Sequence, residues 1–200
     1  MNYLAHLFLA GNDPEVIAGA FLEDFINGNV DNPKNDYLSR KHKVGIRLHR
    51  QIDTITDSHD EVKKCKVFFY EKFGKYSPII VDVLFDHFLI KNWNSFSIEP
   101  FQDFRKRIYR DILITSDIHP EKMKKLVSSM IEHDWLKNYA LDWGLEKAFL
   151  NLNAKIKNPK IDLTTSIEIM RENYEEINKH FLIFFQDLKD FCDSFLKENI

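Results

Sequence analysis

The chain has 200 residues, of which 44% are hydrophobic and 30% charged, the balance of a soluble globular domain with a sizeable core. Its formal net charge of −3 provides no general attraction to nucleic acid or to an anionic membrane surface. Two cysteines in a chain of this length make no disulfide framework, and they lack the C-x-x-C spacing of a thiolate zinc site. We therefore expect one domain over residues 1–200, with neither nucleic acid nor membrane as partner; the sequence predicts no oligomeric state.

The first ten residues are apolar, but they lack a basic segment, His6 interrupts them, and Asp13 and Glu15 follow. Such a stretch is a poor signal peptide. No part of the sequence reaches the roughly 18 apolar residues that a membrane span needs. Together with the scarcity of cysteine, these features predict a cytoplasmic protein.

Apolar residues recur with helical spacing along the chain, and only six glycines and six prolines interrupt them. This pattern predicts an all-α fold, a single-domain bundle of many helices. In chain order, we expect helices over about 2–10, 14–26, 36–56, 59–73, 77–92, 97 or 100 to 114, 119–133, 135–151 and 163–197. Asp13 before Pro14 is typical of a helix N-cap, and Asp57 with Ser58 is expected to cap the helix that follows. Residues 155–160 are expected to form a basic loop.

Histidines and carboxylates occur in four apolar segments before residue 95, where residues should be packing a core. The segments are 2–7, 19–25, 45–57 and 81–89. An ionised group in such surroundings is costly unless a partner or a metal ion compensates it. We therefore expect these groups to meet in a metal-centred pocket; the alternative is polarity scattered over helix surfaces.

The spacing within these segments limits which residues can share an ion. His49 and Asp53 are four residues apart on a predicted helix, about 6 Å apart on one face, and can hold one metal. Asp57 lies about 12 Å from His49 along the helix, so a capping or orienting role suits it better. Asp86 and the adjacent His87 reach one ion only if it lies between their directions. Histidine with several carboxylates suits Mn²⁺, Mg²⁺ or Fe²⁺ better than zinc, and such an ion activates water and polarises a phosphoryl oxygen.

Each candidate also has a purely structural interpretation. His6 could be a satisfied core histidine, and Asp82 could face solvent. Arg50 could clamp a phosphate oxygen, or it could pair with Asp24 or Asp57. Two literal His-Asp dipeptides are expected at the surface: His59-Asp60 and His133-Asp134.

In this order and spacing, the four segments resemble the acyl carrier protein phosphodiesterases of bacteria, also called acyl carrier protein hydrolases. The residues that carry the resemblance are Asn2, Leu4-Ala5-His6-Leu7, Leu9-Ala10, Gly19, Leu22, Asp24-Phe25, Gly28-Asn29, Gly45-Ile46, His49-Arg50, Ile52-Asp53, Thr56-Asp57, Asp82-Val83, Asp86-His87-Phe88-Leu89 and Trp93. They cover residues 1–95, and beyond them the resemblance rests on helical character and length.

The resemblance implies an all-α domain distantly similar to the HD phosphohydrolases, and a manganese-dependent phosphodiesterase, with Mg²⁺ or Fe²⁺ as alternative ions. It implies cleavage of the bond between 4′-phosphopantetheine and a serine of holo acyl carrier protein. Asp86-His87 reverses the usual His-Asp order, which departs from the ligand geometry of HD enzymes. The expected metal ligands are Asp24, His49, Asp53 and Asp86, and the expected catalytic residues are His6, Arg50 and His87, with His6 or His87 supplying a proton to the leaving serine.

An acidic carrier protein would need a local basic patch on this chain. The candidates are Lys63, Lys64 and Lys66, then Arg105, Lys106, Arg107 and Arg110, and finally Lys122, Lys124 and Lys125. Two other functions remain open from the residues alone. One is an HD-like hydrolase of small phosphoesters or nucleotides, and the other is a non-catalytic helical binding module.

Overall fold

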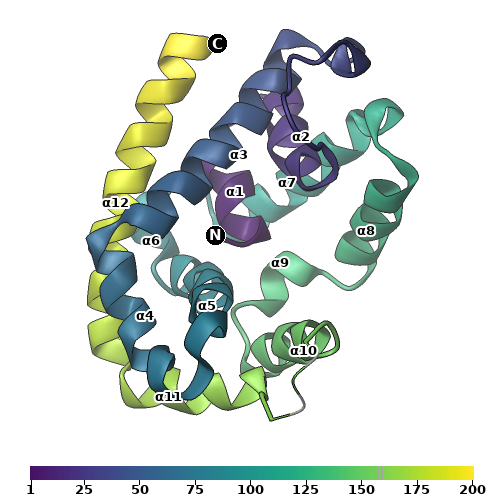
Figure 1. The fold of residues 1–200 in the computed structure, drawn as a ribbon. Helices are drawn as coiled ribbons and strands as arrows, with labels where there is room; N and C mark the ends of the chain where they lie inside the picture. Colours follow the sequence, from purple (N-terminus) through teal and green to yellow (C-terminus); the bar gives the residue numbers. More distant parts are fainter. Residues whose placement is uncertain (157, 159) are drawn as a thin grey trace.

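The computed structural model describes residues 1–156, 158 and 160–200, and over these residues it contains helices and no strand (Figure 1). The all-α prediction is therefore confirmed. The α-helices are α1 (Tyr3–Leu9), α2 (Pro14–Leu22), α3 (Arg40–Ser58), α4 (Asp60–Phe73), α5 (Ser77–Lys91), α6 (Trp93–Phe96), α7 (Phe101–Ile114), α8 (Glu121–Glu132), α9 (Trp135–Asn138), α10 (Asp142–Asn153), α11 (Ser166–Glu172) and α12 (Tyr174–Asn199). Within the described residues, no helix has the length and apolar character to cross a bilayer.

Two predicted helices are broken in the structure. The helix expected over 135–151 becomes α9 and α10, because the chain is extended at Leu141. The helix expected over 163–197 becomes a 3-10 turn at Leu163–Thr165, then α11 and α12. The break before α12 lies at Asn173, whose side-chain amide donates to the carbonyl of Ile169 (2.9 Å). The basic loop expected over 155–160 includes residues 157 and 159, which lie outside the described residues.

The start of α3, predicted at about residue 36, and the cap of α4 also differ from the prediction. Helix α3 begins at Arg40 because Ser39 caps it, accepting from the amide of His42. Helix α4 is capped by His59, whose ring accepts from the amide of Glu61 (3.2 Å). The expected caps Asp57 and Ser58 instead belong to the last turns of α3, since that helix continues to Ser58.

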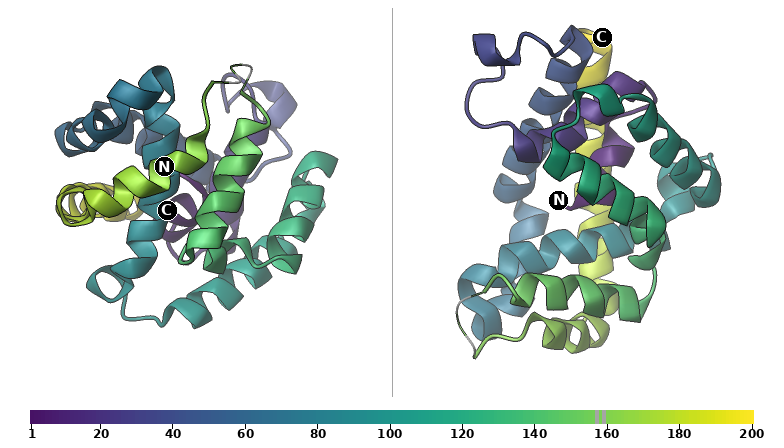
Figure 2. Two further views of the ribbon diagram at one scale, coloured as in Figure 1. Left: turned by 90° about the horizontal axis from the view of Figure 1, so that it is seen from below. Right: turned by 90° about the vertical axis from the view of Figure 1, so that its right-hand side faces the viewer.

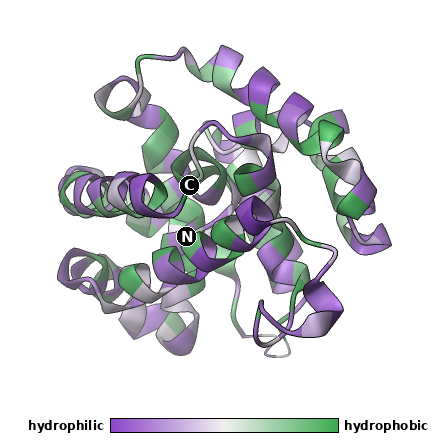
Figure 3. Cartoon of the chain, turned by 90° about the horizontal axis from the view of Figure 1, so that it is seen from above, coloured by the Kyte–Doolittle hydropathy of each residue, from purple (hydrophilic) through white to green (hydrophobic). Residues whose placement is uncertain are grey.

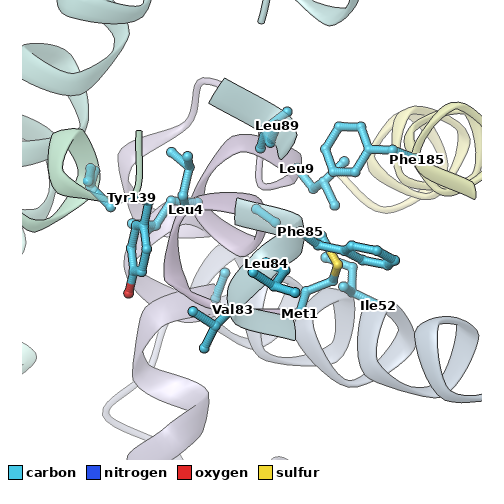
Figure 4. Packing of buried hydrophobic residues seen from close by; sticks show 14 of the residues in the cluster. Met1, Leu4, Leu9, Ile52, Val83, Leu84, Phe85, Leu89, Tyr139 and Phe185 are labelled. Atoms are coloured by element: carbon cyan, nitrogen blue, oxygen red, sulfur yellow. The ribbon is translucent and has the colours of Figure 1, made fainter. Parts of the chain in front are cut away.

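Helix α1 lies at the centre of the molecule, with α2, α5 and α12 packed against it (Figures 1 and 2). The long helix α12 runs along α3, α4 and α5, while α8, α9 and α10 form the opposite side. Hydrophilic and hydrophobic residues alternate along the helices, as expected of helices that bury one face (Figure 3). Close to the amino terminus, the buried side chains of Met1, Ile52, Leu84 and Phe85 gather in the core (Figure 4).

Helices α2 and α3 approach each other at two glycines. A Cβ atom on Gly19 would lie 2.1 Å from the carbonyl oxygen of His42, and one on Gly45 would lie 2.1 Å from that of Val16. Any side chain at these positions would push the helix backbones apart. The close approach matters beyond packing, because α2 and the turn after it provide one wall of the polar cavity described below.

We expect Gly45→Ala to lower the free energy of unfolding by about 1–3 kcal/mol, because the added methyl group overpacks a backbone contact. Urea unfolding followed by circular dichroism measures this. Gln51→Ala, an exposed change on the same helix, is the control and should have little effect. A Gly45→Ala protein as stable as the wild type would show that the helices are not held at this separation.

Candidate metal centre

A polar cavity of about 350 Å³ opens where α1, α2, α3 and α5 meet. Four aspartates line it, together with two histidines. Its lining residues are Met1, Asn2, Tyr3, His6, Ala20, Phe21, Asp24, His49, Asp53, Thr56, Asp57 and Asp82. The cavity confirms that the first three polar segments of the sequence, and part of the fourth, meet in the fold.

The buried side chain of His49 is fixed by the carbonyl of Ala20, which lies 2.7 Å from its Nδ1 atom. A carbonyl oxygen only accepts, so Nδ1 carries the hydrogen, and Nε2 presents a lone pair when the ring is neutral. This Nε2 lies 3.3 Å from Oδ2 of Asp53, one helical turn further along α3. Binding the second ring nitrogen to a backbone carbonyl is how proteins orient a histidine toward a metal ion.

The His6 ring stacks on the His49 ring, with 3.6 Å between centroids and 11° between planes. Its Nε2 lies 3.2 Å from Oδ1 of Asp53. His6 is buried, yet neither ring nitrogen makes a well-aligned hydrogen bond to any described residue. Burial lowers the pKa of His6 to about 3, with the neighbouring His49 acting in the same direction and Asp53 against it, so the ring is neutral at physiological pH.

Asp53 lies between the two rings and is the anion that both of them face. Burial alone would raise its pKa, but the contacts with His49 and His6 hold the pKa of this carboxyl far below its usual range. The same contact with Asp53 raises the pKa of His49, against the effect of burial. A positive charge between these three groups is therefore favourable, and a proton or a metal ion would provide it.

The donor set fits a divalent metal ion. One ligand atom each of His6, His49 and Asp53 lies within 4.8 Å of the others. Neither nitrogen of the buried His6 ring makes a well-aligned hydrogen bond to a described residue, although Nε2 faces Asp53, and this is costly unless something binds there. Two imidazole nitrogens and a carboxylate suit a first-row ion such as Mn²⁺ or Fe²⁺, and the remaining carboxylates of the cavity add to the attraction for a cation.

A second potential ligand group adjoins the first and shares His49. It combines Glu23 and Asp24, which follow α2 in a 3-10 turn, with His49, and the ligand atoms again lie within 4.8 Å of one another. Glu23 Oε2 is 3.9 Å from Nε2 of His49. Asp24 is exposed, at the rim of the cavity. The structure thus brings together Asp24, His49 and Asp53 of the four predicted ligands, and adds His6.

Arg50 does not line the cavity. Its Nε donates to Oε1 of Glu23 (2.8 Å), so its ion pair is with neither of the two predicted partners, Asp24 and Asp57. Asp57 lines the cavity and pairs with Lys66 (3.1 Å). A phosphate-clamping role for Arg50 would therefore require it to leave Glu23.

Asp86 and His87, predicted as a ligand and a catalytic residue, are not among the residues that line the cavity. Asp86 is fully buried, and its two carboxylate oxygens accept from the backbone amides of Leu4 (2.9 Å) and Ala5 (3.0 Å). His87 points its Nδ1 at the carbonyl of Tyr139 (2.8 Å). Both side chains therefore have structural partners away from the cavity, and we no longer place them in the metal centre.

The contacts of Asp86 give it a different role. Asn2, the N-cap residue of α1, makes no side-chain cap hydrogen bond, and Asp86 of α5 satisfies two of the free amides at this helix end instead. Burial raises the pKa of Asp86 to about 7, while the two amide donors oppose that shift. Because α1 begins at Tyr3 and carries His6, and both residues line the cavity, Asp86 positions one side of the cavity from a distant part of the sequence.

The sequence reasoning missed two residues at the cavity, Tyr3 and Glu23. Tyr3 lines the cavity, and burial raises the pKa of its hydroxyl to about 12, so it stays a hydrogen-bond donor. Glu23 precedes the predicted ligand Asp24, and this pair of acidic residues after an apolar helix was the available signal. Asp82, whose placement stayed open between solvent and site, lines the cavity and accepts from the amino group of Met1 (3.1 Å).

The literal His-Asp dipeptides, predicted at the surface, lie outside this cavity; Asp60 and His133 are exposed, whereas His59 and Asp134 are partly buried. The first two predicted basic patches are largely neutralised by ion pairs. Lys63, Lys64 and Lys66 pair with Asp60, Glu61 and Asp57, while Arg105 pairs with Asp134, Arg107 with Glu99 and Asp111, and Arg110 with Asp111. In the third patch, Lys124 pairs with Glu121.

A model of the family described as acyl carrier protein phosphodiesterase matches residues 1–188. A protein of that name from Serratia proteamaculans is 30% identical over 195 residues, which cover 94% of this chain and 95% of the relative. A protein of the same name from Pectobacterium atrosepticum is 31% identical over 187 residues, which cover 92% of this chain and 94% of the relative. Another, from Escherichia coli, is 29% identical over 182 residues, which cover 90% of this chain and 88% of the relative. No solved structure matches the chain, so the likeness to HD phosphohydrolases stays an expectation.

We expect Mn²⁺ to raise the melting temperature of the wild-type protein, because an ion bound only by the folded state adds about 2.7 kcal/mol at 100 times its dissociation constant. Asp53→Asn should remove most of this effect, since the ion loses its anionic ligand. Thermal scans with and without Mn²⁺ measure it, and Asp117→Asn, an exposed change, is the control. An equal Mn²⁺ response in Asp53→Asn and wild type would contradict this metal site.

Asp86→Asn should lower the free energy of unfolding by about 1–3 kcal/mol at pH 8, because the NH2 group of asparagine would replace one of the two acceptor oxygens and face a backbone N–H donor. Chemical denaturation measures it, again with Asp117→Asn as control. Mn²⁺ should still stabilise the variant, since Asp86 is not placed as a ligand. Abolished Mn²⁺ stabilisation with unchanged intrinsic stability would return Asp86 to the metal centre.

Proposed function

The chain belongs to the acyl carrier protein phosphodiesterase family, and from this premise we propose that it hydrolyses holo acyl carrier protein in a metal-dependent reaction. The bond cleaved is the phosphodiester between 4′-phosphopantetheine and a serine of the carrier. The observation that carries the proposal is the cluster of His6, His49 and Asp53 in one cavity, within the part of the chain that the family model matches.

His6 and His49 would hold the ion through their Nε2 atoms, with Asp53 as the anionic ligand and Asp24 available at the rim. We propose Mn²⁺, with Mg²⁺ or Fe²⁺ as alternatives. When bound, such an ion supplies an activated water and a polarised phosphoryl oxygen. The electrostatics support the need for it, because a cavity lined by four aspartates would otherwise repel a phosphodiester anion.

The protein groups hold the reactants and stabilise charge. The Ala20 carbonyl fixes His49 in the tautomer whose Nε2 faces Asp53. Tyr3, protonated at physiological pH, can donate a hydrogen bond to a phosphoryl oxygen as negative charge develops on it. The neutral His6 suits a ligand role better than the proton-donor role predicted from the sequence, and His87 is turned to Tyr139.

The reaction balances as a hydrolysis. The oxygen of water bonds to phosphorus, and the bond between phosphorus and the serine oxygen breaks. The serine oxygen takes a proton. The products are apo carrier protein, with a free serine hydroxyl, and 4′-phosphopantetheine.

We expect the wild-type protein with Mn²⁺ to convert holo carrier protein to the apo form, seen as loss of the phosphopantetheinyl mass. His49→Ala should reduce kcat/KM by about 100-fold or more, because a lost ligand removes several kcal/mol of charge stabilisation. Gln51→Ala, two residues further along the same helix and exposed, should retain activity. Mass spectrometry of the carrier reports all three.

A holo carrier that keeps its mass, while an established member of this family cleaves the same preparation, would overturn the proposed function. Small phosphoesters and nucleotides would then be the substrates to test. Tyr3→Phe provides a finer test of the site. It should lower kcat more than it raises KM, because the proposed hydrogen bond strengthens as the transition state forms.

A further inference from the structure

A second cavity, of about 470 Å³, adjoins the metal-binding cavity. The two share Met1, Asn2, Tyr3 and Asp82 in their linings, so their walls are continuous at the start of α1 and on α5. From there the second cavity extends between α5, α8, α9 and α10, on the side of the molecule where Figures 1 and 2 place the three later helices. The metal binding and hydrolysis proposed above do not involve this second cavity.

We propose that this second cavity binds the pantetheine arm of the holo carrier protein while its phosphodiester lies at the metal centre. The inference rests on the proposed function and names where the rest of that substrate lies. In a phosphodiester, the phosphorus links two alcohols, so one side of the metal centre must accommodate the carrier serine and another the arm. Among the described residues, the adjoining cavity offers a concave space for the arm.

The lining matches the chemistry of the arm, which is an uncharged chain with a branched dimethyl group, a hydroxyl, two amides and a terminal thiol. Apolar side chains dominate the walls, among them Val83, Leu126, Trp135, Ala148 and Leu152. A few polar groups are interspersed, as in most small-molecule pockets, whose volumes run from about 300 to 1,000 Å³. Asn138 is one of them, and its side-chain amide donates to the carbonyl of His133 (2.8 Å), which leaves its oxygen to accept from an amide of the arm.

The charged residues also differ between the two cavities. Four aspartates line the metal-binding cavity, whereas only Asp82 of these also lines the second cavity, together with the exposed Lys147 and Lys155. Neither lysine makes an ion pair with any residue in the described part of the chain. The uncharged arm would therefore meet one carboxylate in the second cavity, against four in the metal-binding cavity.

Two substitutions test this proposal, because each would reduce the volume of the second cavity from a different helix. Ala148 of α10 and Ser129 of α8 both line it and are partly buried, and tryptophan at either position would fill the space. Ala154→Trp is the matched control, because Ala154 is exposed at the end of α10 and does not line the cavity. Each protein is assayed with Mn²⁺ on holo carrier protein and on bis(p-nitrophenyl) phosphate, a phosphodiester that has no pantetheine arm.

For Ala148→Trp and Ser129→Trp, the ratio of kcat/KM for the carrier to kcat/KM for the small diester should fall about tenfold or more, because binding energy from the arm contributes to the rate. Ala154→Trp should leave the ratio at the wild-type value. Added pantetheine, which lacks the phosphate, should inhibit hydrolysis of the carrier by the wild type and much less by Ala148→Trp.

If both tryptophan variants keep the wild-type ratio, the arm does not bind in this cavity, and the inference is overturned while the proposed function stands. A lower ratio only for carriers that bear an acyl chain would also overturn it, since the cavity would then hold the acyl group and not the arm. If the wild-type protein does not cleave the holo carrier at all, both the proposed function and the inference are overturned.

Discussion

The carboxylate of Asp86, buried at the end of α1, is the contact on which the arrangement of the site depends. It accepts from the amides of Leu4 and Ala5 and so fixes a short helix that has no side-chain cap of its own. That helix carries His6 to the candidate metal centre, and Tyr3 at its first position lines both cavities. A buried carboxylate with both oxygens on amide donors is held strongly, and its removal would leave two amides unsatisfied in the core. One residue thus couples the stability of the fold to the geometry of the proposed chemistry.

A second constraint acts on the opposite wall. Gly19 and Gly45 let α2 and α3 approach to backbone contact, and this approach brings the Ala20 carbonyl within 2.7 Å of His49. The stacked histidines then face Asp53 from two helices that are distant in sequence. The cluster is therefore assembled by close packing on one side and by a buried hydrogen-bonded carboxylate on the other. Together these two contacts explain how glycine and aspartate at apolar positions shape the candidate site without lining its cavity.

Helical periodicity was enough to predict the all-α fold and most helix positions, because apolar spacing reports directly on which face is buried. It missed the breaks at Leu141 and Asn173, where the chain departs from helix geometry without a glycine or proline. The i, i+4 pair of His49 and Asp53 was readable because both lie on one helix. The roles of Asp86 and His87 were not, because they depend on partners, the α1 amides and the Tyr139 carbonyl, that only tertiary packing brings near. A polar residue in an apolar segment signals an unusual environment, but the sequence does not distinguish a metal ligand from a buried cap.

The central claim is that His6 and His49 bind one divalent ion together with Asp53. Pulsed electron paramagnetic resonance of the Mn²⁺-loaded protein tests it most directly, because nitrogen couplings report each coordinated imidazole. The account predicts couplings from two imidazole nitrogens in the wild type, and from one in either His6→Gln or His49→Gln. A wild-type spectrum without imidazole coupling, or one unchanged by both substitutions, would contradict it.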